Sequence, residues 1–124
     1  MLKPLAMLCM DSPVLGSQLA ARLSELGYQI HEVKDPSKLF ALTGKHMPFL
    51  IITELGQSRQ KTLESIRLIR SADSTKHIPI LGVDRLTSNQ PDPDSLTSGI
   101  TLVAAEKRIL DQLPDLLEQL LAME

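Results

Sequence analysis

The sequence predicts an α/β fold, a doubly wound parallel sheet of five strands with helices on both faces. Short apolar runs alternate with stretches of helical periodicity along the whole chain, as in successive βα units. The apolar runs are almost continuous, which is typical of strands buried on both faces. A length of 124 residues suits one compact domain, so we expect a single domain over 1–124.

The first βα unit has the clearest boundaries. Residues 5–10 form a continuous apolar run and predict a strand. Leucines then recur at helical spacing until Gly27, which is a helix stop signal. Pro13 suits the first turn of this helix, and we expect Asp11 or Ser12 to cap it.

The next two units repeat the pattern. Residues 29–33 predict a short strand, and 36–45 predict a weak helix. Residues 49–54 are the most apolar short run of the chain and predict a buried third strand that ends at Glu54. Apolar residues three and four apart then predict a helix over about 59–71.

The last two units are less regular. Residues 78–83 predict a fourth strand and 101–105 a fifth, and a leucine-rich helix follows with Pro114 in its early part. Between 86 and 99 the periodicity fails among prolines and aspartates. We therefore expect the fourth helix to be shortened or lost.

Composition excludes several classes of function. The net charge is −2 and the basic residues are scattered, which argues against nucleic acid as a partner. Aromatic residues make up only 2% of the chain, so a base-stacking surface is not expected. No apolar stretch is long enough to span a membrane, and the one cysteine, Cys9, has no internal disulfide partner. These features predict a cytoplasmic protein without membrane contact.

Four passages, in order and at matching spacing, resemble response-regulator receiver domains, the CheY-like proteins of two-component signalling. They are Asp11-Ser12-Pro13, Glu25-Leu26-Gly27-Tyr28, Pro48 to Leu55, and His77 to Leu81. The resemblance covers nearly the whole chain. It implies a flavodoxin-like sheet with strand order 2-1-3-4-5, a protein partner in a bacterial-type phosphorelay, and a possible homodimer.

The resemblance also implies a site for phosphorylation, and this sequence departs from it. A working receiver uses a pair of acids that hold Mg²⁺, a phosphoacceptor Asp, a Thr or Ser, and a Lys. At those positions this chain has Met10 with Asp11, then Glu54, Asp84 and Ala105. An added methylene in the acceptor, an anion in place of a hydroxyl and a missing lysine all oppose transfer of a phosphoryl group.

These departures predict a degenerate pseudo-receiver with an acidic pocket of Asp11, Glu54 and Asp84 and no catalytic residues. We expect a protein-interaction module that works independently of phosphorylation, and not an enzyme. Glu54 could also mimic a phosphorylated state as a fixed anion. No cofactor is expected. A metal is not favoured, but if one binds, the resemblance implies Mg²⁺ at Asp11 and Glu54.

Two alternatives remain. The first is an atypical receiver that is phosphorylated at Asp11 or Asp84, or that recruits Lys107 through a shifted strand. The second is a flavodoxin-like module that binds a small molecule.

The remaining reactive side chains suggest no chemistry of their own. We expect Cys9 to be a small buried hydrophobic residue. His31, His46 and His77 share no ligand spacing, so solvated or structural roles are expected for all three.

Overall fold

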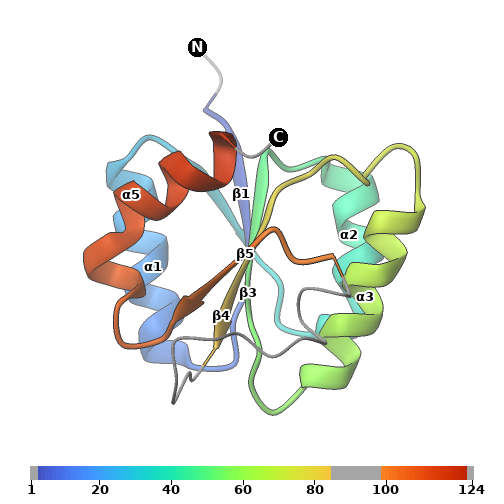
Figure 1. The fold of residues 1–124 in the computed structure, drawn as a ribbon, viewed down its shortest axis with the longest axis horizontal. Coiled ribbons are helices and arrows are strands. Elements are labelled where there is room, and N and C mark those ends of the chain that lie inside the picture. The colour runs from blue at the N-terminus through green and yellow to red at the C-terminus, as the bar shows by residue number, and fades with distance from the viewer. Residues whose placement is uncertain (1–2, 85–98, 123–124) are drawn as a thin grey trace.

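The computed structural model describes residues 3–84 and 99–122. These residues form a parallel sheet of five strands in the order β2-β1-β3-β4-β5. Helices cover both faces of this sheet (Figure 1). The predicted fold class and strand order are therefore confirmed. The prediction of a shortened or lost fourth helix lies outside the described residues.

The elements lie close to their predicted bounds. The strands are β1 (Leu5–Cys9), β2 (Gln29–Glu32), β3 (Leu50–Glu54), β4 (Ile80–Asp84) and β5 (Leu102–Ala105). The helices are α1 (Pro13–Glu25), α2 (Leu39–His46), α3 (Arg59–Ser71) and α5 (Ile109–Ala122), and the 3₁₀ turn η1 (Pro36–Lys38) precedes α2. Pro114 lies inside α5 without ending it.

Two apolar clusters explain how the sheet is held between its helices. Alternate residues of a strand point to opposite faces, so neighbouring residues of β1 enter different clusters. Leu8 packs with Leu19 of α1 and Leu117 of α5, whereas Met7 packs with Ile66 of α3. Figure 1 shows the same division, with α1 and α5 on one face and α2 and α3 on the other.

Arg70 joins the end of α3 to the amino-terminal side of the sheet. Its guanidinium donates to the carbonyl oxygens of Lys76, Ile78 and Gly99 and to the hydroxyl of Thr101, at 2.6–3.0 Å. Burial lowers the pKa of Arg70 below its usual value. The four acceptors are uncharged, so this half-buried cation is held by dipoles.

All five strands run in parallel, so their carboxyl ends meet at one edge of the sheet. Glu54, Asp84 and Ala105 are the last residues of β3, β4 and β5, and Asp11 follows the end of β1. In open α/β sheets, functional groups gather outside this edge.

Within the described ranges, no helix has the length and apolar character needed to cross a bilayer.

Candidate functional site

Glu54 is held by the first residues of α1. The backbone N–H of Ser12 donates to Oε1 of Glu54 over 3.0 Å, and the Ser12 hydroxyl donates to Oε2 over 2.9 Å. Ser12 occupies the N-cap position of α1, but its side chain makes no capping hydrogen bond. Ser12, one of the two expected capping residues, is therefore the N-cap residue, but its hydroxyl binds Glu54 and not the backbone of α1. One carboxylate thus accepts two hydrogen bonds from one residue.

Asp11 shares a cavity with Glu54. A Cβ placed on Gly56 would lie 2.5 Å from Oδ2 of Asp11 and 3.3 Å from Oε2 of Glu54, so both carboxylates adjoin this glycine. The cavity has a volume of about 460 Å³, and Glu106 also lines it. Asp11 is exposed, whereas Glu54 and Glu106 are half-buried. Asp11 and Glu54, two of the three acids of the predicted pocket, therefore line the same cavity at this edge of the sheet.

Asp84 has a different partner. Its Oδ2 lies 3.2 Å from Nη1 of Arg59, the first residue of α3, and the Asp84 side chain is only 13% exposed. Asp84 does not line the cavity shared by Asp11 and Glu54. Asp84, the third acid of the predicted pocket, thus forms an ion pair that joins the end of β4 to the start of α3.

The end of β5 shows which residue occupies the position where receivers have a lysine. Asp84 and Ala105 are paired in the register of β4 and β5, and β5 ends at Ala105. Lys107 is exposed in the turn that follows. The strand shift that would bring Lys107 into the place of Ala105 is absent from this register.

Cys9 lies in the core, not in the site. It is 3% exposed and belongs to the cluster on the α2–α3 face. Burial raises the pKa of its thiol to about 11. Since the thiolate is the nucleophilic form, a buried thiol that stays protonated near neutral pH has no role at this edge.

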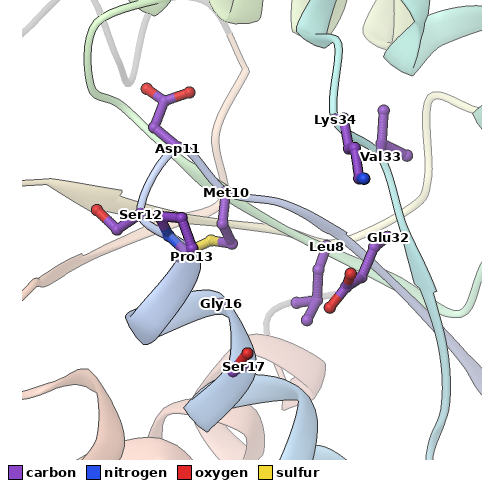
Figure 2. Close-up of a pocket in the computed structure, with 10 residues that line it drawn as sticks. All are labelled: Leu8, Met10, Asp11, Ser12, Pro13, Gly16, Ser17, Glu32, Val33 and Lys34. Atoms are coloured by element: carbon purple, nitrogen blue, oxygen red, sulfur yellow. The ribbon is translucent and has the colours of Figure 1, made fainter.

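A second cavity lies beside the first. It has a volume of about 430 Å³ and an apolar floor that includes Leu8 and Met10. Figure 2 shows the lining residues, which come from the end of β1, the start of α1 and the end of β2. Glu32 and Lys34 are exposed at its rim. Asp11 and Ser12 line both cavities and therefore separate them.

Solved structures of known proteins share this architecture over almost their whole length. A response regulator from Thermotoga maritima matches with a TM-score of 0.80 and 16% identity, over 98% of this chain and 99% of that one. The chemotaxis protein CheY4 of Vibrio cholerae matches with a TM-score of 0.83 and 18% identity, over 96% and 99%. The chain has the fold of response-regulator receiver domains. No family model matches the sequence, and the comparison with curated proteins finds no match.

One receiver structure is useful for comparison of the metal site. The receiver domain of a sensor histidine kinase from Pseudomonas aeruginosa, with a magnesium ion coordinated in its active-site cleft, matches with a TM-score of 0.81 and 20% identity, over 98% and 99%. In this chain, Met10 supplies no oxygen ligand, and both oxygens of Glu54 accept hydrogen bonds from Ser12. No group of three or more Asp, Glu, His or Cys side chains within 3–84 and 99–122 could hold a metal. Compared with the receiver position for an acidic pair, this chain keeps one carboxylate, Asp11, and the Glu54 carboxylate is already hydrogen-bonded to Ser12.

Three residues of this site were missed by sequence reasoning. Ser12 was noted only as a cap, Arg59 only as a helix start, and Glu106 not as part of a pocket. Ser12 and Arg59 each contact a residue from another βα unit. The position of Ser12 directly after Asp11, at the predicted carboxyl edge, is the one signal that could have indicated its role.

Proposed function

We propose that this chain is a receiver-like domain of two-component signalling that binds a protein partner without accepting a phosphoryl group. The observation that carries the proposal is the double hydrogen bond from Ser12 to Glu54. A carboxylate that attacks phosphorus needs an oxygen free to approach in line. Both oxygens of Glu54 are instead engaged by the N-terminus of α1.

The surroundings of Glu54 support the same conclusion. Phosphoryl transfer depends on cations that neutralise the developing charge. The receiver position for lysine is Ala105, and Lys107 is exposed in the next turn. Arg59, a cation at this edge, lies against Asp84. The site therefore offers anions where a phosphoryl group would require positive charge.

A protein partner is favoured because the receiver fold is kept while its phosphorylation chemistry is not. The carboxyl edge carries two neighbouring cavities, separated by Asp11 and Ser12, in which a partner's side chains would fit. No substrate is turned over in this account. Glu54 serves as a fixed charge that holds the β1–α1 loop against the end of β3.

The test is binding with and without a phosphodonor. Histidine kinases and phosphotransfer domains from the same genome would be titrated calorimetrically into the purified chain, before and after treatment with Mg²⁺ and a small phosphodonor. We expect the affinity for the partner that binds to be the same in both states. A partner that binds only the treated chain would contradict phosphorylation independence.

The cavity in Figure 2 favours a second candidate function, binding of a small molecule. Its volume of about 430 Å³ lies within the range of ligand sites, and its floor is apolar while its rim carries Glu32 and Lys34. A native mass spectrum of the purified chain tests this directly. A retained ligand would support this function, whereas a spectrum of bare protein from several expression hosts would leave the partner-binding proposal.

A further inference from the structure

Two histidines lie in contact at the β2 edge of the sheet. His31 comes from β2, and His46 is the last residue of α2. Their ring centroids are 4.4 Å apart and their planes meet at 36°. Both residues are half-buried. This pair could not be predicted from the sequence, because 15 positions separate the two residues and no ligand spacing links them.

The imidazole nitrogens of this pair have no partner in the described part of the chain. Neither ring donates or accepts a hydrogen bond there, and neither forms an ion pair. Half-buried polar groups are usually hydrogen-bonded to protein or water. The two rings lie against each other, and their nitrogens are not used within the described residues. These nitrogens are therefore available to coordinate an external ligand.

The separation of the rings matches shared coordination of one metal ion. A metal–nitrogen bond of about 2.1 Å places each imidazole centroid about 3.2 Å from the metal. Two ligands at a right angle, as in octahedral or tetragonal sites, then have centroids about 4.5 Å apart. The observed 4.4 Å agrees with this value. Tetrahedral ligands would lie about 5.2 Å apart, so Zn²⁺ would require the rings to separate slightly.

The end of α2 also favours a cation. The last carbonyl groups of a helix form the negative end of its dipole, and His46 is in the last turn of α2. Met47, which follows, has a left-handed backbone with φ 47°, and its N–H donates to the carbonyl of Thr43. This bond closes the helix directly after His46. Lys45 precedes His46 in the sequence and is exposed. Its positive charge is the nearest one in the sequence that would repel a bound cation.

We propose that His31 and His46 form a binding site for a borderline divalent transition-metal ion, such as Ni²⁺ or Cu²⁺. Imidazole suits these ions, whereas Mg²⁺ prefers oxygen ligands. No third Asp, Glu, His or Cys joins the pair within the described ranges. Water or a donor from another molecule therefore completes the coordination shell. The site is separate from the carboxyl edge and does not depend on the proposed function.

The test is calorimetric titration of NiCl₂ into the chain without an affinity tag. We expect one binding site, no heat with MgCl₂, and at least about tenfold weaker binding in His31→Gln and in His46→Gln, because each variant removes one of two ligands. His77→Gln is the matched control, since His77 is exposed and lies outside the pair. It should bind like the wild type.

Circular dichroism of each variant establishes that it is folded before the titration is compared. A ratio of one metal ion per two chains, lost in His31→Gln, would also assign the site to this pair, with a second copy completing the shell. No uptake of Ni²⁺ at millimolar concentration would overturn the proposal. Binding of unchanged strength in both pair variants would overturn it as well, whether or not His77→Gln retains it.

Discussion

Ser12 binds both oxygens of the Glu54 carboxylate, although 42 residues separate the two in sequence. The contact joins the N-terminus of α1 to the end of β3. It fixes a negative charge against the positive end of a helix dipole, which is a favourable arrangement without any metal. It also engages the oxygens that a phosphoacceptor would need.

Ser12→Ala removes the hydroxyl donor and leaves the backbone N–H in place. Because a hydrogen bond to a charged, half-buried group is lost, we expect the free energy of unfolding to fall by about 1–2 kcal/mol. Urea denaturation measures this change. Ser17→Ala is the matched control, since Ser17 is exposed on α1 and its side chain makes no hydrogen bond within the described residues. Equal effects from both variants would argue against the contact.

Arg59 and Asp84 are expected to stabilise the fold through their ion pair. The two side chains are 26% and 13% exposed, so solvent screens the pair only in part. A double-mutant cycle with Arg59→Gln and Asp84→Asn should give a coupling energy of about 1 kcal/mol. Urea denaturation of the four proteins provides the measurement. Additive effects of the two substitutions would contradict a direct interaction.

Arg70 should be difficult to replace with another cation. Its planar guanidinium makes four hydrogen bonds in different directions, and a single ammonium cannot reproduce them. We expect Arg70→Lys to lower the free energy of unfolding by about 2–3 kcal/mol. Arg67→Lys, on an exposed position of α3, should change it by less than about 0.5 kcal/mol. A similar loss in both variants would show that the four contacts contribute little.

Because the Cys9 thiol is buried, we expect the folded protein to lose stability at alkaline pH. The unfolded thiol ionises near its ordinary value of 9.0, whereas burial raises the pKa of the folded thiol to about 11. Between these values the unfolded state binds fewer protons, so stability is complete below pH 9 and falls as pH rises towards 11. The contribution of this group is at most about 3 kcal/mol.

The measurement is the difference in urea stability between wild type and Cys9→Ala from pH 8 to pH 11. Burial also raises the pKa of Tyr28, but this residue is present in both proteins and cancels. We expect the stability of wild type to fall more steeply than that of Cys9→Ala. Parallel curves would mean that the thiol is not shielded from water.

The fold could be predicted because its signals are local. The apolar run that ends at Glu54 is β3, and the predicted helix over 59–71 is α3 at the same bounds. Receiver-like landmarks then gave the strand order, which the sheet confirms. Burial of Cys9 followed from its place in an apolar run.

The side-chain contacts could not be predicted in the same way. Ser12 with Glu54, Arg59 with Asp84, and His31 with His46 are each joined by the packing of different βα units. No spacing rule covers pairs so far apart in sequence, because their distance depends on register and helix placement. Asp11, Glu54 and Asp84 all lie at the carboxyl edge of the sheet, but the contacts of each acid could not be inferred from the sequence.

The most direct test of the account is the intact mass of the chain after incubation with Mg²⁺ and a small phosphodonor. A receiver domain known to be phosphorylated serves as the positive control in the same reaction. Glu54→Asp is a useful second sample, because it restores the usual acceptor while Asp84 and Ala105 remain. We expect the mass of both wild type and Glu54→Asp to be unchanged. A stoichiometric gain of one phosphoryl group by the wild type, at Glu54 or Asp11, would contradict the account.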